Sequence, residues 1–226
     1  TAKNGLPVQD EKGSFVLDEE AVTAYVQSLA EEYDGYGRTR QFHSTRGDVI
    51  TIDGGTYGSK MDRKKEIAYL LEHLLDPGVH TGTQQSHIPS YEREAFCYGK
   101  NDIGDTYIEV DMTEQKMYYY EKGVLKLETE IVTGNMRRRM GTPEGVNFVY
   151  NKQKNRVLRG PGYASPVKFW MPVKGGIGIH DAGWRKEFGG DIYQTAGSHG
   201  CINTPKDKME ELFDCVQIGT PVVMFY

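Results

Sequence analysis

The feature that most constrains the fold of this chain is a change in its hydrophobic pattern at Gly104. Beyond Gly104, apolar residues recur at every second position in short runs, as at Ile108 and Val110 and again at Met117 and Tyr119. Glycine-containing turns separate these runs, and a period of two is typical of strands with one buried face. Residues 104–226 are therefore predicted to form a mostly antiparallel β-domain of sandwich or open-barrel type.

One helix and a last strand are predicted near the end of this β-domain. Met209, Leu212 and Phe213 share one face of a helix over residues 205–216. A closing strand is predicted over residues 221–226.

The first half has a helical pattern instead. Apolar residues at three- and four-residue spacing predict a helix over residues 18–33, with Asp18 as its N-cap. A short strand over 48–53 and a second helix over 62–75 follow, so an α+β domain is predicted over 1–103 and the β-domain over 104–226. The expected buried face of the first helix comprises Val22, Tyr25, Val26, Leu29 and Tyr33.

Composition excludes several classes of protein. The chain has 38% hydrophobic and 26% charged residues, which is typical of a soluble globular protein. A net charge of −5 argues against a nucleic-acid partner, which requires a basic face. No apolar run is long enough to span a membrane. The sequence begins at Thr1 without a leader segment, and loss of an N-terminal anchor is left open.

The strongest chemical signal is Cys201 within residues 197–203, with His180 upstream. The neighbours of Cys201 are small and polar, whereas Cys97 and Cys215 lie among apolar residues and are expected to be plain free thiols. Free cysteine has a pKa near 8.5, and an imidazole within reach activates it by accepting the thiol proton. Cys201 is therefore predicted to be a nucleophile.

Two histidines compete for the role of base. His199 lies two residues before Cys201, so an extended backbone would place both side chains on one side. His180 is distant in sequence, and spacing alone does not bring it near. Gly200 allows a close approach of the backbone, and the amides of Gly200 and Cys201 are candidate oxyanion donors. The histidines of the first half lack metal-site spacing, and no metal or cofactor is expected.

His180, seventeen intervening residues and then Ser198-His199-Gly200-Cys201 form a pattern that resembles the signature of the YkuD-type L,D-transpeptidases. The resemblance covers roughly the second half of the chain. Further matching segments are residues 107–111, 116–120, 132–134, 141–145, 176–181 and 219–223.

This resemblance implies a β-sandwich with a small helical element and assigns His180 as the base. Ser198 and His199 would support the site, and a main-chain carbonyl of Ser198 or Asp181 would orient His180. Asp181 stands where many family members have glycine or serine, and Asn203 stands where many have arginine. The residues expected to contact substrate are Asp181, Trp184, Arg185 and Asn203, which resemble the Gram-positive variant.

The resemblance also implies a function in peptidoglycan synthesis and hence in cell-wall biogenesis and cell shape. Cys201 would be acylated by a stem tetrapeptide with release of D-Ala, and the acyl group would pass to the side-chain amine of a second stem. Carbapenems would acylate the same thiol. The alternatives are an L,D-carboxypeptidase that uses water and a non-catalytic wall-binding module.

The first half also has a resemblance, over residues 48–63, to the peptidoglycan-binding domain that precedes the catalytic domain in some Gram-positive L,D-transpeptidases. A plain spacer is the alternative. The expected protein is a monomer that lies outside the cytoplasm, at the cell wall or the outer face of the cytoplasmic membrane of a Gram-positive bacterium.

Overall fold

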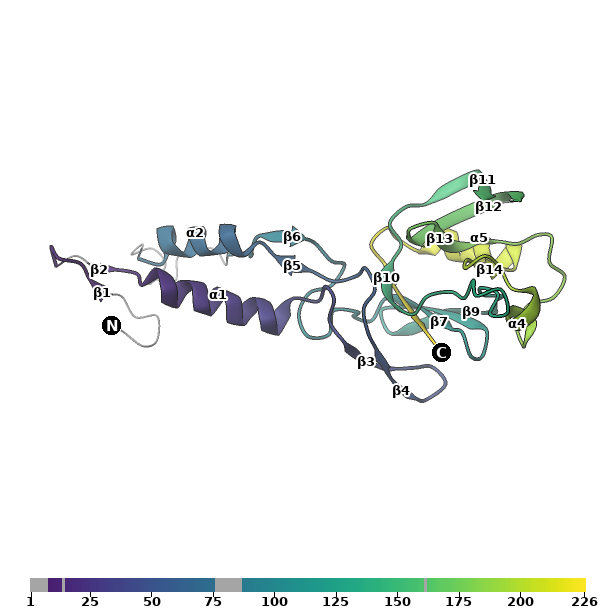
Figure 1. Ribbon diagram of the computed structural model, residues 1–226, viewed down its shortest axis with the longest axis horizontal. Helices are drawn as coiled ribbons and strands as arrows, with labels where there is room; N and C mark the ends of the chain where they lie inside the picture. The colour runs from purple at the N-terminus through teal and green to yellow at the C-terminus, as the bar shows by residue number, and fades with distance from the viewer. Residues whose placement is uncertain (1–7, 14, 76–86, 161) are drawn as a thin grey trace. The chain divides into compact units, whose positions relative to one another are not determined.

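The computed structural model describes residues 8–13, 15–75, 87–160 and 162–226 (Figure 1). The chain folds into two compact units, each discontinuous in sequence. The first comprises Thr1–Gly35 and Gly58–Asp102, and the second comprises Tyr36–Tyr57 and Ile103–Tyr226. Residues 36–57 thus belong with the second half of the chain, while the division into domains 1–103 and 104–226 stays a prediction.

Two helices form the core of the first unit. Helix α1 (Glu19–Tyr33) begins at Asp18, whose carboxylate accepts hydrogen bonds from the N–H groups of Glu20 and Ala21. Helix α2 (Arg63–His73) begins in the same way at Asp62, which accepts from the N–H of Lys65. Apolar residues of α2 pack against a narrow stripe of α1, formed by Val22, Val26 and Ala30.

The predicted buried face of α1 was partly wrong. Tyr25 is 56% and Tyr33 41% exposed. Tyr25 lies beside the stripe at i, i+4 and i+8 that α2 covers, and Tyr33 lies in the last turn. Short strand pairs complete this unit: β1 (Val8–Gln9) with β2 (Phe15–Val16), and β5 (Lys60–Met61) with β6 (Tyr91–Arg93).

Two larger sheets form most of the second unit (Figure 1). All their strand pairs are antiparallel except β7 with β15 and β13 with β14, so the predicted mostly antiparallel fold is confirmed. The five-stranded sheet has the order β10 (Gly145–Phe148), β15 (Pro221–Phe225), β7 (Tyr107–Asp111), β8 (Lys116–Glu121), β9 (Val124–Glu130). The four-stranded sheet has the order β11 (Gln153–Gly160), β12 (Tyr163–Lys174), β13 (Ile177–Asp181), β14 (Ile202–Thr204).

One hydrophobic core joins the two sheets and helix α5 (Lys206–Cys215). Met209, Leu212 and Phe213 supply the buried face of α5, as the sequence predicted. Helix α4 (Ile192–Ala196) was not predicted, because five residues without a buried side chain carry no periodic signal.

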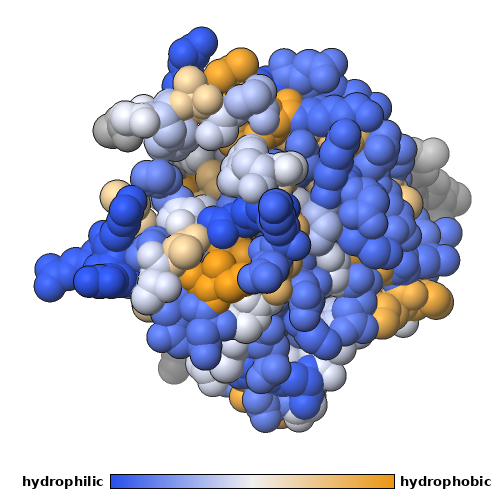
Figure 2. All heavy atoms as spheres, turned by 90° about the vertical axis from the view of Figure 1, so that its right-hand side faces the viewer, coloured by the Kyte–Doolittle hydropathy of each residue, from blue (hydrophilic) through white to orange (hydrophobic). Residues whose placement is uncertain are grey.

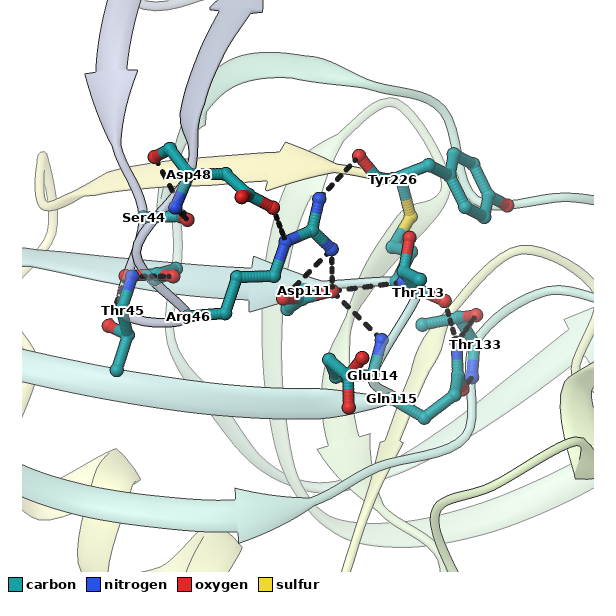
Figure 3. Close-up of polar contacts among 12 residues, drawn as sticks. Ser44, Thr45, Arg46, Asp48, Asp111, Thr113, Glu114, Gln115, Thr133 and Tyr226 are labelled. Atoms are coloured by element: carbon teal, nitrogen blue, oxygen red, sulfur yellow. Dashed lines mark hydrogen bonds and ion pairs between the residues drawn. The ribbon is translucent and has the colours of Figure 1, made fainter.

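A hairpin of residues 36–57 is part of the second unit. Strand β3 (Arg40–His43) pairs with β4 (Val49–Ile52), and the turn between them carries Thr45 and Arg46. The Arg46 guanidinium lies 3.0 Å from the Asp111 carboxylate at the end of β7 (Figure 3). Thr45 donates two hydrogen bonds to the buried Glu109 of the same strand. These contacts attach the hairpin to the five-stranded sheet.

No helix within the described parts of the chain is long and apolar enough to span a membrane.

Candidate active site

Strand alternation places a histidine, a cysteine and an asparagine on one side of the four-stranded sheet. In the parallel pair β13 and β14, Ile179 lies beside Ile202 and His180 beside Asn203. The two isoleucines are fully buried in the core. Because successive side chains of a strand point to opposite faces, His180 and Asn203 face away from the core. Cys201 directly precedes Ile202 and lines the same pocket as both.

The imidazole of His180 is only 3% exposed and has a defined partner at each nitrogen. Nδ1 lies 2.9 Å from the main-chain carbonyl oxygen of Asp181, and Nε2 lies 3.1 Å from the side-chain nitrogen of Asn203. The rings of Trp170 and Trp184 flank it, each with its centroid 5.8 Å away. Burial lowers the pKa of His180, and the hydrogen bond and charge of Asp181 oppose this shift only in part.

The Cys201 thiol is half-buried, and its Sγ lies 3.8 Å from the carbonyl oxygen of Gly176. Burial raises the pKa of this thiol, and a backbone hydrogen bond from Gly178 opposes the rise. For both His180 and Cys201, therefore, the protein favours the uncharged form in the resting site.

The tight turn before Cys201 is closed by the hydroxyl of Ser198. Its Oγ donates to the carbonyl of Cys201 at 2.6 Å and accepts the N–H of Gly200 at 3.0 Å. Gly200 has φ +114°, a backbone conformation that residues other than glycine rarely adopt. The Gly200 N–H, a candidate oxyanion donor, is thus engaged with Ser198 in the resting structure.

Neighbouring segments hold this turn from outside. Thr142 Oγ1 donates to the carbonyl of Gly200 at 2.8 Å and accepts the N–H of Gly134 at 3.0 Å. The carbonyl of Ser198 accepts the N–H of Asn135 at 2.9 Å. The main-chain carbonyl that contacts His180 is that of Asp181, not that of Ser198. Sequence reasoning noted residues 141–145 only as a matching segment, and no local pattern indicated what Thr142 bonds.

The second histidine lies differently. His199 is exposed, and its ring stacks on Tyr163 with a centroid distance of 4.6 Å. Tyr163 begins β12, so this stack joins the turn before Cys201 to the β11–β12 hairpin.

The four residues expected to contact substrate have distinct surroundings. The Asp181 carboxylate is buried and accepts the N–H of Phe169 at 2.7 Å, and Asp181 lines neither pocket at Cys201. Trp184 is 52% exposed and lines one of them. Arg185 donates through Nε to Asn203 Oδ1 at 2.7 Å, and both residues line that same pocket.

Two pockets meet at Cys201. One has a volume of about 200 Å³ and contains the His180 side, and the other has a volume of about 400 Å³ and extends along β11 past Arg156 and Arg159. Leu158 and Tyr163 line both pockets.

The face of the molecule seen in Figure 2 is mostly hydrophilic, with separate small apolar areas. Among the residues that the structure describes, no group of three or more His, Cys, Asp or Glu side chains is placed to hold a metal ion.

Comparison with known proteins agrees with this geometry. Residues 105–224 match the family described as L,D-transpeptidase catalytic domain. A crystal structure of a cysteine-to-serine mutant of Enterococcus faecium L,D-transpeptidase is 37% identical, covers 98% of this chain and 87% of that chain, and has a TM-score of 0.84. The chain belongs to the L,D-transpeptidase family.

Two further solved L,D-transpeptidases are similar. The avibactam carbamoyl enzyme of Ldtfm is 38% identical over 97% of this chain and 85% of that chain, with a TM-score of 0.84. The NMR structure of the isolated E. faecium catalytic domain is 51% identical, covers 54% of this chain and 97% of that chain, and has a TM-score of 0.50. No curated protein matches the chain.

Residues 3–78 match a second family, described as "Putative peptidoglycan binding domain". That match includes segments of both compact units, because it contains the hairpin of residues 36–57. The chain is thus an L,D-transpeptidase enzyme with peptidoglycan as its substrate, and its two families imply a location at the cell wall.

Proposed function

We propose that this L,D-transpeptidase uses Cys201 as its nucleophile and His180 as its general base. The observation that carries the proposal is their shared pocket. His180 lies on β13, Cys201 directly precedes the neighbouring parallel strand β14, and the carbonyl of Asp181 orients the imidazole. A nucleophile, a base and a group that orients the base are the three parts that acyl transfer by a thiol requires.

The first half-reaction acylates the enzyme. Nε2 of His180 takes the Sγ proton as sulfur attacks the carbonyl before the terminal D-Ala of a stem tetrapeptide. The N–H of Cys201 donates to the oxyanion, and the Gly200 N–H joins it on leaving Ser198 Oγ. The C–N bond then breaks, the departing D-Ala amine takes the proton from His180, and a thioester remains on Cys201.

The second half-reaction forms the cross-link. The side-chain amine of another stem attacks the thioester, His180 takes one amine proton, and the C–S bond breaks. The thiolate recovers a proton from His180, so no metal, redox partner or nucleotide enters the balance. The two pockets at Cys201 support transfer, because donor and acceptor stems must both reach the sulfur.

The larger pocket also has the charge that a stem requires. Arg156 and Arg159 line it, and a guanidinium pairs well with a stem carboxylate. Release to water, which would make the protein an L,D-carboxypeptidase, remains the second candidate, since Cys201 is only half-buried. We further propose a monomer that acts outside the cytoplasmic membrane of a Gram-positive bacterium, with its first domain on the glycan or peptide of the wall.

The test is intact-protein mass spectrometry of the full chain after incubation with a carbapenem. We expect one adduct on the wild type and none on Cys201→Ala. Cys215→Ala is the matched control and should keep the adduct, because Cys215 is the most exposed free thiol and lies outside both pockets. An adduct that persists in Cys201→Ala would refute the assignment. Products from a tetrapeptide with and without an amine acceptor then separate transfer from hydrolysis.

A further inference from the structure

A chain of hydrogen bonds runs through the buried side of the site. Arg185 donates through Nε to Asn203 Oδ1 at 2.7 Å and through Nη2 to the carbonyl of Ala196 at 2.8 Å. The other end of the Asn203 amide lies 3.1 Å from Nε2 of His180. Asn203 is 2% exposed, so water does not compete for either end of its amide.

Each hydrogen bond in this chain determines the next one. A guanidinium only donates, so the atom of Asn203 that faces Arg185 is the oxygen. The NH₂ group therefore faces His180, and because an amide NH₂ also only donates, Nε2 must accept. The single proton of the neutral ring then lies on Nδ1, where the Asp181 carbonyl accepts it at 2.9 Å.

We propose that Arg185, acting through Asn203, is a positioning residue that works together with the Asp181 carbonyl to hold His180 in the Nδ1–H tautomer. The inference rests on the proposed function, in which the lone pair of Nε2 exchanges the Asn203 N–H for the thiol proton of Cys201. In the opposite tautomer Nε2 carries a hydrogen and cannot act as a base. Both residues were expected to contact substrate, yet the amide of Asn203 and two guanidinium nitrogens of Arg185 are bonded within the protein.

The same arrangement acts on the protonated ring. When His180 holds the proton from Cys201, an N–H at Nε2 meets the NH₂ of Asn203, and the bond to Arg185 opposes a flip of that amide. The imidazolium therefore gives its proton readily to the leaving amine. The charged groups that act on the ring are the Asp181 carboxylate and the Arg185 guanidinium. The uncharged rings of Trp170 and Trp184 flank it.

The direct test is ¹⁵N NMR of the histidine rings in the resting, full-length protein, which reports which nitrogen carries the proton. The wild type should show His180 protonated at Nδ1 alone. Arg185→Met should give a mixture of tautomers, and Arg185→Lys should restore part of the wild-type signal by donating to Asn203. Asn203→Asp places an acceptor at Nε2 while the Asp181 carbonyl still holds the proton on Nδ1, so the ring should become protonated at both nitrogens. Lys186→Met, an exposed neighbour in the same loop, is the matched control and should leave the spectrum unchanged.

Kinetics of acylation give an independent reading. Arg185→Met should lower kcat at least about tenfold, a part of the roughly 10²–10⁴-fold that a general base contributes, with little change in KM. Asn203→Asp should also shift the acid limb of the pH profile to higher pH. A wild-type His180 ring protonated at Nε2 would overturn the proposal. An Arg185→Met variant that keeps the wild-type tautomer and shows only a raised KM would also overturn it and would favour a contact between Arg185 and substrate. A correct tautomer in a protein that no substrate or carbapenem acylates would instead refute the proposed function alone.

Discussion

Replacement of Arg46 by methionine should lower the free energy of unfolding of the second unit by about 3 kcal/mol. The Asp111 carboxylate is fully buried, with 0% exposure, and the Arg46 side chain beside it is 21% exposed. Loss of one partner of a buried ion pair costs roughly 3–5 kcal/mol, because the remaining charge stays away from water. The partial exposure of Arg46 places the expected cost at the lower end. Two N–H groups, of Thr113 and Glu114, still donate to Asp111 and limit the loss.

Arg46 does more than neutralise one carboxylate, as Figure 3 shows. It also pairs with Asp48 at 2.7 Å and donates to the main-chain carbonyl of Tyr226 at 3.2 Å. It therefore connects the 36–57 hairpin to β7 and to the C-terminus. Met keeps much of the aliphatic stem, so that the substitution removes mainly the charge and the hydrogen bonds.

The measurement is urea unfolding of the full chain followed by tryptophan fluorescence. Trp170 and Trp184 are the two tryptophans of the chain, and both lie in the second unit, so the signal reports on that unit. For a unit of this size, about 3 kcal/mol corresponds to a fall of roughly 6–12 °C in Tm. The thermal transition provides a second check.

The matched control is Lys116→Met. Lys116 pairs with Glu128 at 2.8 Å, but the two side chains are 38% and 48% exposed, and such a pair contributes about 0–1 kcal/mol. In Asp111→Asn the amide oxygen still accepts the two N–H groups, and the Arg46→Met/Asp111→Asn double variant should be more stable than the sum of the single losses predicts. Equal losses in Arg46→Met and Lys116→Met, or strict additivity in the cycle, would refute the reasoning.

Three further outcomes are expected. Burial lowers the pKa of His180 below 6.5, so just below pH 6.5 the unfolded chain binds a proton that the folded chain does not. The free energy of unfolding should therefore fall as the pH drops from about 6.5. His180→Gln should flatten the slope of the urea midpoint against pH. Gly200→Ala imposes φ +114° on a residue with Cβ and brings that atom 3.3 Å from Ile177, so the acylation rate should drop while the protein loses about 1–3 kcal/mol; unchanged acylation would count against the turn geometry. A Cβ at Gly55 would lie 2.0 Å from the carbonyl oxygen of Val146, so Gly55→Ala should cost more than the about 1 kcal/mol typical of point mutations. Gly54 also has a positive φ, +69° against +97° at Gly55, but a Cβ there has nothing within 4 Å, so Gly54→Ala should cost less. Equal urea midpoints for the two variants would exclude the clash.

Regular elements were the most predictable part of the fold. The period of two beyond Gly104, the N-cap at Asp18 and the apolar face of α5 are local patterns, and the structure has the elements that they indicate. The hairpin of residues 36–57 shows the limit. Its strand β4 was predicted, but its partner β3 was not. Its membership of the second unit involves contacts between distant residues, such as Arg46 with Asp111, 65 residues away.

The candidate site divides in the same way. Residue types and spacing along the chain were enough to select Cys201 and to offer two histidines, since a thiol nucleophile needs an imidazole and small neighbours that leave it accessible. The choice between Ser198 and Asp181 as the carbonyl that contacts His180, and the partners of Asn203, were decided only in the folded chain. Arg185 reaches Asn203 across 18 residues and Asn203 reaches His180 across 23. Hydrogen-bond direction between such distant groups depends on strand register and burial, which no short stretch of sequence contains.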